Sequence, residues 1–272
     1  MKKGILIVSF GTTYRETRKK TIKAVERDVA AAYPGIEVYH AFSSGMIRRR
    51  IEKQEGIHVP DVREALGQMK VSGITHVCIQ PTYVITGIEN DRLNRETAAW
   101  KQEFEQIQTG TPLLTDDADY EKVVEALWEE YGRAEEDRIL LFIGHGTEHE
   151  AHKSYDKLEQ AFHRQGHRNV FVATVEGEND QEDLLRRIRG QDGTNNTDQV
   201  FREARAREIL LIPLMLVAGD HARHDIAGED DSYLELFQSA GFEAEAILRG
   251  LGECRGIRDI YLSHLADEMM VK

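Results

Sequence analysis

Short hydrophobic runs along the chain alternate with stretches in which apolar residues recur every three or four positions. In the first half, the runs are rich in β-branched or aromatic residues and are bounded by Gly, Pro or Ser, which is typical of buried parallel strands. These strands are expected at Ile5–Phe10, Val38–Phe42, His76–Ile79 and Leu113–Leu114. The stretches between them predict helices over Thr17–Tyr33, Val62–Val71 and Leu93–Ile107. Strands that alternate with helices of this length predict an α/β fold with a parallel sheet.

The second half of the chain repeats this plan. Its strands are expected at Ile139–Ile143, Val170–Thr174, Ile209–Leu216 and Ala244–Leu248. Its helices are expected near Ser154–Arg164, Asp180–Arg189, Asp198–Arg207 and Asp231–Ala240. Two further helices, over residues 120–131 and 257–269, follow the last strand of each half and are candidates to pack on the opposite half. We therefore expect two domains, residues 1–133 and 134–272, each a four-stranded parallel sheet flanked by helices, with a cleft between them.

Three segments of the first half recur about 132 to 135 residues later. Gly4–Thr12 is answered by Arg138–Thr147, Glu37–Gly45 by Asn169–Gly177, and Ile79–Gly87 by Leu211–Gly219. A residue with reactive chemistry in only one of two similar copies points to a site. The paired positions that differ in this way are Phe10 and His145, Ser44 and Glu176, and Glu89 and His221. Each follows an apolar run, and in parallel sheets ligands bind beyond the carboxyl ends of the strands.

Two imidazoles and one carboxylate are a typical ligand set for a divalent transition metal. Because His145, Glu176 and His221 follow three strands of one domain, we expect them to meet at one cleft and to hold a metal ion. The alternative is three separate polar residues at loop starts. Glu89 is expected to face them from the first domain as an acid/base or as a fourth ligand. The glycines beside His145 could also cradle a phosphate, but neither copy contains GxGxxG or GxxxxGK[ST].

The formal net charge of −13 argues against nucleic acid as the main partner, because phosphate contacts need a basic surface. One basic cluster stands out against this background, Arg48-Arg49-Arg50 with Lys53, just beyond the second expected strand. It is either a solvated helix face or a clamp for a ligand with several carboxylates, because arginine pairs well with carboxylate groups. Arg92 and Arg95 could extend such a clamp.

The chain has two cysteines, no CxxC motif and no apolar run long enough to span a membrane. A disulfide framework is therefore excluded, and a reducing compartment is favoured. The apolar segment near the amino terminus is too short for a signal peptide and lacks a small-residue cleavage site. We expect a cytoplasmic protein without a membrane partner. The sequence carries no signal for an oligomeric state.

Several motifs together resemble a known family. They are Val8–Thr12, Ala41–Ile47, Gly144–Gly146, Val175–Glu176, Gly250–Glu253 and, most distinctively, Pro213–His221 with the sequence PLMLVAGDH. From end to end, the chain resembles the anaerobic-type sirohydrochlorin cobaltochelatases of the class II chelatase superfamily. The resemblance implies two flavodoxin-like or Rossmann-like halves around a tetrapyrrole cleft. The chain departs from the family at Tyr83, where members often carry a histidine.

The resemblance implies insertion of Co²⁺ into sirohydrochlorin in anaerobic cobalamin biosynthesis, with no organic cofactor and the metal as a substrate. The family's metal-handling residues fall on His145, Glu176 and His221, and its characteristic glutamate falls on Glu89. Arg48, Arg49 and Arg92 would bind the tetrapyrrole carboxylates. Insertion of iron or nickel, or a metal or tetrapyrrole carrier without catalysis, are the alternative functions, because ligand type alone does not separate these metals.

Overall fold

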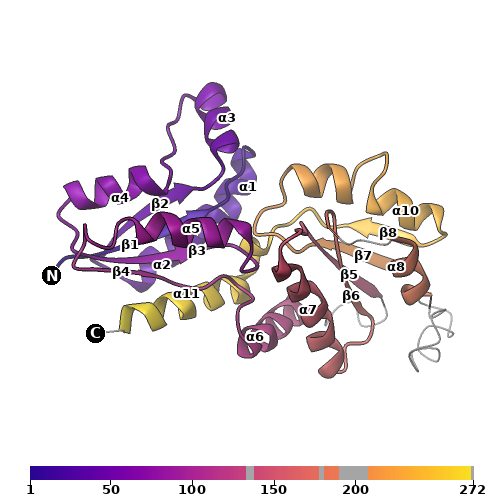
Figure 1. Ribbon diagram of the computed structural model, residues 1–272. Coiled ribbons are helices and arrows are strands. Elements are labelled where there is room, and N and C mark those ends of the chain that lie inside the picture. Colours follow the sequence, from indigo (N-terminus) through magenta and orange to yellow (C-terminus); the bar gives the residue numbers. More distant parts are fainter. Residues whose placement is uncertain (133–137, 178–180, 190–207, 271–272) are drawn as a thin grey trace. The chain divides into compact units, whose positions relative to one another are not determined.

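The computed structural model describes residues 1–132, 138–177, 181–189 and 208–270, with the backbone only at residues 268 and 270. Contacts divide the chain into two compact units. Unit 1 comprises Met1–Asp119 and Leu251–Lys272, and unit 2 comprises Tyr120–Gly250. Each contains a four-stranded parallel sheet flanked by helices, which confirms the expected fold class. Figure 1 shows the elements of both units.

The sheet of unit 1 has the strand order β2-β1-β3-β4. Its strands are β1 (Lys3–Ser9), β2 (Glu37–Phe42), β3 (His76–Pro81) and β4 (Gln106–Thr109). Its helices are α1 (Arg15–Lys20), α2 (Ile22–Ala32), α3 (Gly45–Glu55), α4 (Val62–Val71), α5 (Ile88–Ala98), the 3₁₀ turn η4 (Leu251–Glu253) and α11 (Arg255–Met270). The sheet order is that of doubly wound flavodoxin-like folds, in which crossovers on both sides of the first strand bury it centrally.

The sheet of unit 2 has the matching order β6-β5-β7-β8. Its strands are β5 (Ile139–Gly144), β6 (Val170–Thr174), β7 (Glu208–Pro213) and β8 (Glu243–Ala246). The remaining elements are α6 (Asp117–Leu127), the π-helical turns η1 (Trp128–Gly132) and η3 (Ala222–Ile226), the 3₁₀ turn η2 (Glu150–His152), and the helices α7 (Lys153–Arg164), α8 (Gln181–Ile188) and α10 (Tyr233–Ser239). The helix expected near Asp198–Arg207 lies outside the described residues.

The fourth strand of unit 1 is not where the hydrophobic pattern placed it. Leu113–Leu114 forms only an isolated bridge, from Leu114 to Ile85, whereas Gln106–Thr109 pairs with β3. The prediction was wrong because β4 is an edge strand whose side chains are only partly buried, so its sequence alternates polar residues with a single isoleucine. The helix expected over Leu93–Ile107 is also shorter at its end, because Gln106 and Ile107 belong to β4. The helix α5 spans Ile88–Ala98.

The helix expected over Thr17–Tyr33 is two helices. They join at Thr21, whose backbone leaves the helical region with φ −110° and ψ −81°. The buried Thr21 hydroxyl donates to the carbonyl of Thr17 at 2.7 Å, a local bond that competes with regular helix geometry. The expected helix over Val62–Val71 has those bounds in the structure, and a capping box between Asp61 and Glu64 starts it.

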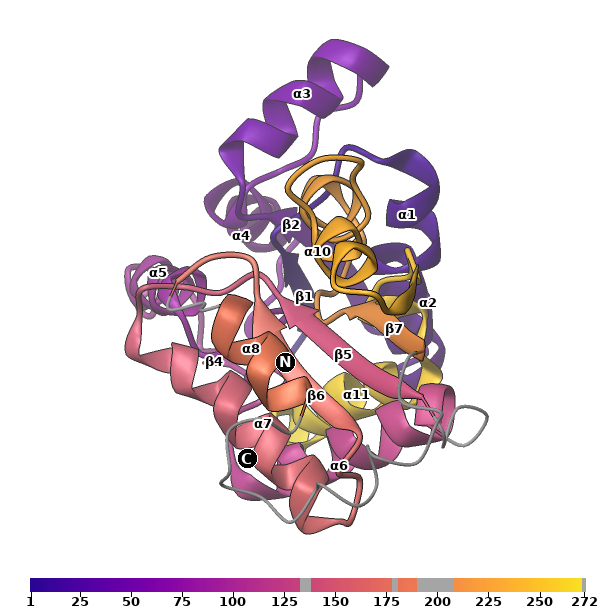
Figure 2. The same ribbon diagram turned by 90° about the vertical axis from the view of Figure 1, so that its right-hand side faces the viewer.

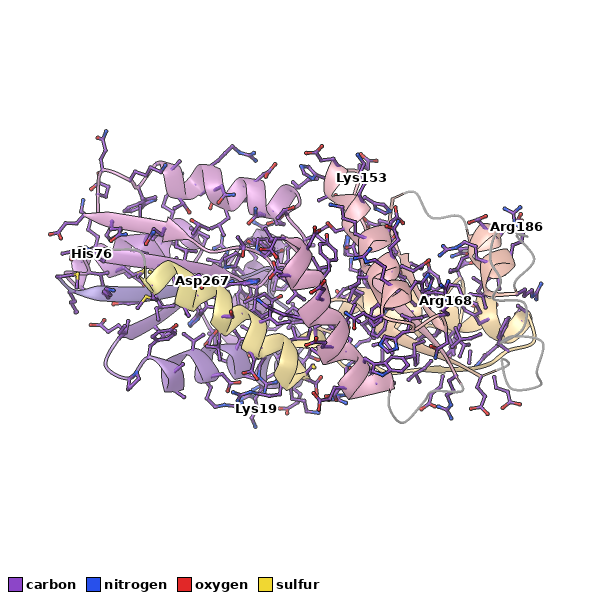
Figure 3. The ribbon with its side chains drawn as sticks, turned by 90° about the horizontal axis from the view of Figure 1, so that it is seen from below. Lys19, His76, Lys153, Arg168, Arg186 and Asp267 are labelled. Atoms are coloured by element: carbon purple, nitrogen blue, oxygen red, sulfur yellow. The ribbon has the colours of Figure 1, made fainter. Side chains whose placement is uncertain are left out.

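Each sheet is covered on both faces. In unit 1, α4 and α5 pack on one face around Leu6, Val8 and Ile79, and α2 and α11 lie on the other (Figure 1). Seen from below in Figure 3, α11, labelled at Asp267, lies in front of the strands of this sheet. In unit 2, α7 and α10 lie on opposite faces of β5 (Figure 2). Phe142 of β5 stacks on Phe162 of α7, with ring centroids 5.4 Å apart.

The contact-based division differs from the linear boundary expected between residues 133 and 134. The helix α11, which follows unit 2 in the sequence, packs on β3 and α2 of unit 1. Arg258 of α11 donates to Asp28 of α2 at 2.7 Å, with both side chains buried. His264 binds Asp119 at 2.7 Å in an equally buried pair. Among the helices of the described residues, none has the length and apolar character that crossing a membrane requires.

The internal repeat seen in the sequence is also a repeat of hydrogen bonding. Strand pairs in the two sheets have the same register. Ser9 pairs with Phe42 in the first sheet, and the equivalent residues Gly144 and Thr174 pair in the second. The same holds for Val8 with Pro81 and for their equivalents, Ile143 with Pro213. The Ser44 amide donates to the Phe10 carbonyl at 3.3 Å, and in the second copy the Glu176 amide donates to the His145 carbonyl at 2.8 Å. Paired positions therefore occupy equivalent places at the carboxyl edges of the two sheets.

Candidate metal centre

The loop after β5 holds His145 between two glycines, and the structure requires the second of them. Gly146 has a φ of +87°, and a Cβ there would lie 1.8 Å from the carbonyl oxygen of Glu176. Only glycine adopts this conformation without strain and permits so close an approach of two backbones. The glycine therefore brings the loop that carries His145 against the loop that carries Glu176.

The first glycine of the motif makes room for an aromatic ring below the loop. A Cβ on Gly144 would lie 2.2 Å from the ring of Tyr155 on α7. The Tyr155 hydroxyl accepts a hydrogen bond from the Gly146 amide at 3.3 Å. Burial raises the pKa of Tyr155, so its hydroxyl stays neutral at physiological pH. The ring therefore supports the His145 loop without adding charge.

The loop after β6 is held by hydroxyl groups. The Thr174 side chain donates to the carbonyl of Glu176 at 2.9 Å, and the Tyr233 hydroxyl donates to the carbonyl of Thr174 at 2.7 Å. Gly177 has a φ of +91°, and a Cβ there would lie 3.0 Å from the ring of His152. These bonds fix the backbone of Glu176, while its side chain remains exposed and free to bind a ligand.

His221 follows β7 and stands at the start of the π-helical turn η3. One turn later, Asp225 accepts a hydrogen bond from the His221 Nδ1 at 2.8 Å. This bond places the proton on Nδ1 and leaves the lone pair of Nε2 for a ligand. Sequence reasoning missed Asp225. The signal available for it was the spacing of four residues from His221, which brings two side chains to one side of a helical turn.

The three expected side chains come together in unit 2. One possible ligand atom each from His145, Glu176 and His221 lies within 4.8 Å of the other two. The Nε2 atoms of the two histidines are 3.1 Å apart, and the His145 Nδ1 is 3.7 Å from a Glu176 carboxylate oxygen. Both histidine side chains are 43% exposed, so solvent and solutes reach the cluster. We call these three residues the His-Glu-His cluster.

The tautomer of His145 follows from its neighbour. Its Nδ1 lies 3.2 Å from the carbonyl oxygen of Gly146, which can only accept a hydrogen bond. The proton of a neutral ring therefore belongs on Nδ1, as in His221, and both Nε2 atoms present lone pairs. A cluster of two such nitrogens and one carboxylate can bind a divalent transition metal.

Comparison with known proteins shows the family of the chain. A family model described as Cobalt chelatase (CbiK) matches residues 3–270 of the chain. The chain belongs to the cobalt chelatase family. The family expected from its motifs is thus confirmed.

Two relatives of this chelatase carry closely related names. The sirohydrochlorin cobaltochelatase of Salmonella typhimurium is 35% identical over 266 residues, which cover 97% of this chain and 96% of the relative. The sirohydrochlorin cobaltochelatase CbiKC of Nitratidesulfovibrio vulgaris is 30% identical over 268 residues, which cover 97% of this chain and 89% of the relative. The match therefore extends over both units.

Solved structures show the same fold. SirB from Bacillus subtilis with Fe³⁺ superposes with a TM-score of 0.62 at 14% identity, covering 98% of this chain and 95% of that one. The sirohydrochlorin chelatase SirB from Bacillus subtilis subspecies spizizenii, in complex with cobalt, gives a TM-score of 0.61 at 13% identity, with coverages of 98% and 95%. At these identities the likeness shows the fold alone.

The other expected site residues of the chelatase lie in unit 1. Glu89 is in the first turn of α5, where a carboxylate interacts favourably with the helix dipole. Its Oε2 atom is buried and has no hydrogen-bond partner among the described residues. Arg92, one turn later, binds Glu96 at 2.9 Å, which raises the pKa of its guanidinium.

The basic cluster on α3 contains arginines in different situations. Arg48 is half-buried and binds Asp61 at 3.2 Å and Glu64 at 3.6 Å. Arg49 is exposed, and within the described part of the chain its guanidinium has neither a hydrogen bond nor an ion pair. It folds back toward the start of α3, where a Cβ on Gly45 would lie 3.3 Å from its Nη1. Arg48 thus stabilises the start of α4, whereas Arg49 makes no such bond within the described residues.

Proposed function

We propose that the protein inserts Co²⁺ into sirohydrochlorin, and that His145, Glu176 and His221 hold the ion before its transfer. The observation that carries this proposal is the meeting of their three possible ligand atoms within 4.8 Å at the ends of β5, β6 and β7. Membership of the cobalt chelatase family, and relatives named for this reaction, support it. The ion is a substrate of the reaction.

The spacing of the histidines suits a shared ion. Imidazole nitrogens bind such ions at about 2.0–2.1 Å, so two of them on one ion lie about 3 Å apart. The Nε2 atoms of His145 and His221 are 3.1 Å apart. Because the Nδ1 of each ring has an oxygen acceptor beside it, the Nε2 of each neutral ring is left for a ligand. Glu176 adds one negative charge, which offsets part of the charge of a divalent ion. Only three ligands come from the protein, so the ion keeps positions for water and then for pyrrole nitrogens.

Insertion also releases two protons from the pyrrole nitrogens of a free-base tetrapyrrole. We assign acceptance of the first proton to Glu89, because its Oε2 is a buried hydrogen-bond acceptor that has no partner among the described residues of unit 1. A carboxylate in such a position gains a hydrogen bond when a donor arrives, which favours binding of the proton-bearing face of the ring. A macrocycle that is held bent exposes a nitrogen lone pair, which is a use of binding energy to approach the transition state.

The peripheral carboxylates of the tetrapyrrole need cationic partners. Arg49 is suited to this role because its guanidinium is exposed and makes no ion pair within the described residues. Arg92 is less suited, because its guanidinium already forms an ion pair with Glu96. Arg48 would have to give up Asp61 and Glu64. We therefore assign carboxylate binding mainly to Arg49, in a cytoplasmic enzyme of anaerobic cobalamin biosynthesis.

Purified protein is mixed with sirohydrochlorin and Co²⁺, and the visible spectrum is followed through many turnovers. Parallel reactions contain Fe²⁺ or Ni²⁺, because ligand affinity alone does not distinguish these metals. His145→Ala serves as the site variant. His224→Ala is the matched control, because the exposed ring of His224 forms a hydrogen bond with the carbonyl of Asp220 in the same segment.

The proposal is supported if the protein inserts far more than one equivalent of cobalt. This activity should be lost in His145→Ala and kept in His224→Ala. A reaction that stops at one equivalent would identify a carrier and overturn it. Faster turnover with Fe²⁺ or Ni²⁺ than with Co²⁺ would overturn the choice of metal.

A further inference from the structure

Positive charge flanks the carboxyl edge of the sheet in unit 1. The helix α1 contains four basic residues and one acidic residue, and α3 contains four basic and two acidic residues. The chain as a whole has a formal net charge of −13. Because α1 follows β1 and α3 follows β2, both helices begin beyond the carboxyl ends of these neighbouring strands. An acidic chain therefore carries a basic region at the sheet edge where parallel α/β folds bind ligands.

A buried ion pair joins the two helices, which lie next to each other in Figure 1. The Arg18 guanidinium of α1 donates to both carboxylate oxygens of Glu55 on α3, at 2.8 and 2.7 Å. Its other terminal nitrogen donates to the carbonyl of Thr12, in the loop after β1, at 3.2 Å. The side chains of the pair are only 10% and 18% exposed, so salt screens this pair weakly. The two helices are therefore held against each other, and their exposed charges act from a fixed position.

Five basic side chains of these helices are exposed to solvent. Arg15, Lys19 and Lys20 project from α1, and Arg49 and Lys53 project from α3. Within the described residues, none of the five forms a hydrogen bond or an ion pair. Arg15 and Lys19 are four residues apart, as are Arg49 and Lys53, so each pair lies on one side of its helix. We call these five residues the basic surface.

The second copy of the fold does not repeat this charge. Arg15 corresponds to Glu150, and Arg49-Arg50 corresponds to Gln181-Glu182. The two sheets nevertheless have matching strand orders, and the loops after their first two strands make equivalent hydrogen bonds. The fold therefore forms without positive charge at these positions. The difference in sign matches the two proposed substrates, because the His-Glu-His cluster for a cation is in unit 2, whereas a tetrapyrrole with several carboxylates is an anion.

We propose that the basic surface attracts the polycarboxylate tetrapyrrole and speeds its association with unit 1. This inference rests on the proposed function and extends its carboxylate site from Arg49 to the three basic residues of α1. Charges on helices in contact add their fields over about 8 Å at physiological ionic strength, which raises the local concentration of an anion. The occupant is a small polyanion rather than a nucleic acid, because the net charge of −13 repels a long chain of phosphates.

The test measures association directly and needs no metal. Purified full-length protein is mixed with sirohydrochlorin in a stopped-flow instrument, and the change in the visible spectrum gives the association and dissociation rates. The measurement is repeated between about 0.02 and 0.5 M salt, a range over which the Debye length falls from about 20 to about 4 Å. The variant Arg15→Glu/Lys19→Glu/Lys20→Glu reverses the exposed basic charges of α1 and leaves Arg49 in place.

The matched control changes the net charge of the protein by the same amount in unit 2. Lys157→Glu/Arg164→Glu/Arg168→Glu alters three exposed basic residues of α7 and of the turn before β6. Arg168 lies near the amino end of β6, at the opposite edge of that sheet from the His-Glu-His cluster. A general effect of net charge therefore appears in both variants, whereas attraction by the basic surface appears only in the first.

We expect the charge-reversed α1 variant to associate with sirohydrochlorin about tenfold more slowly than the wild type at low salt. At high salt the difference should narrow to about twofold, because screening removes the long-range attraction. The dissociation rate and the kcat of cobalt insertion should stay within about twofold of the wild type, since a charge outside the contacts of the bound state acts mainly on association. The neutral variant Arg15→Gln/Lys19→Gln/Lys20→Gln should show a smaller loss, and thermal midpoints establish that each variant folds.

Several results would overturn the inference. They are a wild-type association rate in the charge-reversed α1 variant, equal slowing in this variant and in the unit 2 control, and a loss that is the same at low and high salt. Binding of a short DNA duplex that is lost in the charge-reversed variant, with unchanged association of sirohydrochlorin, would assign the surface to nucleic acid instead. Failure of the wild type to insert cobalt, with salt-dependent association of sirohydrochlorin intact, would count against the proposed function and not against this inference.

Discussion

The imidazole rings of His145 and His221 meet edge to face, with planes inclined at 79° and Nε2 atoms 3.1 Å apart. Each ring has an acceptor at its Nδ1, the Gly146 carbonyl for one and the Asp225 carboxylate for the other. Two neutral rings so oriented would direct two lone pairs at each other. A proton or a cation between the Nε2 atoms removes that repulsion, so this pair is built to share a positive charge.

Loss of either imidazole should therefore abolish binding and insertion of the metal ion. We expect His145→Ala and His221→Ala each to lower the rate of cobalt insertion by more than about 100-fold, because two ligands cannot hold the ion as three do. Initial rates from visible spectra measure this effect. Unchanged circular dichroism shows that the fold persists, and near-normal turnover in either variant would remove that residue from the site.

The Asp225 carboxylate should matter almost as much as a ligand. Asp225→Asn keeps the shape but no longer attracts the Nδ1 proton of His221, so we expect the KM for Co²⁺ to rise about 10- to 100-fold. Steady-state kinetics at saturating tetrapyrrole measure it. Glu229→Gln, an exposed change on the same segment, is the control. Equal KM values in the two variants would show that Asp225 does not orient His221.

The contact between the two loops can be tested at Gly146. Gly146→Ala places a Cβ 1.8 Å from the Glu176 carbonyl, so we expect a lower thermal midpoint and loss of cobalt insertion. Gly166→Ala isolates the cost of a positive φ, because Gly166 has a φ of +94° and open space around its Cα. That cost is about 1 kcal/mol. A Gly146→Ala variant as stable and active as Gly166→Ala would contradict the close approach seen here.

Arg48 and Arg49 should separate stability from binding. Arg48→Ala loses the bonds to Asp61 and Glu64, so we expect a lower thermal midpoint. Arg49→Ala loses no hydrogen bond or ion pair within the described residues, so we expect an unchanged midpoint and a KM for the tetrapyrrole raised several-fold, the pattern of lost uniform binding. Melting curves and kinetics on both variants measure the two effects. An unchanged KM in Arg49→Ala would mean that the basic cluster is a solvated helix face.

Asp28 should make stability depend on pH. Burial alone would raise its pKa, but the hydrogen bond and charge of Arg258, together with Arg27 and Arg255, lower it below the value of the unfolded chain. The stabilisation is therefore present above the unfolded pKa of about 3.9 and is lost as the pH falls through the folded value.

We expect Asp28→Asn to cost about 2 kcal/mol near neutral pH and much less in strong acid. Thermal midpoints across this pH range provide the measurement. Asp259→Asn is the control, because Asp259 binds Arg255 at the exposed surface. A penalty for Asp28→Asn that does not change with pH would refute this account.

Local sequence patterns were sufficient to predict most of the strands. Apolar runs flanked by glycine or proline predicted seven of the eight strands of the described residues within a few residues. The four central strands, β1, β3, β5 and β7, gave the clearest signal, because central parallel strands are buried on both faces. The eighth, β4, was missed because its sequence, QIQT, contains a single apolar residue and so has no hydrophobic run. The comparison of the two copies also found His145, Glu176 and His221, because equivalent strand ends occupy equivalent places.

Other features depended on contacts between particular polar side chains, which the hydrophobic pattern does not reveal. The sequence by itself determined the two-sheet plan and the three residues of the His-Glu-His cluster, since hydrophobic periodicity and strand ends are local properties. Only the tertiary structure decided that Arg48 binds Asp61 and Glu64, that Asp225 orients His221, and that α11 joins unit 1 through Arg258 and Asp28. The physical reason is that hydrogen bonds and ion pairs depend on distances between side chains, and folding sets those distances by burying apolar surface that no short window of sequence contains.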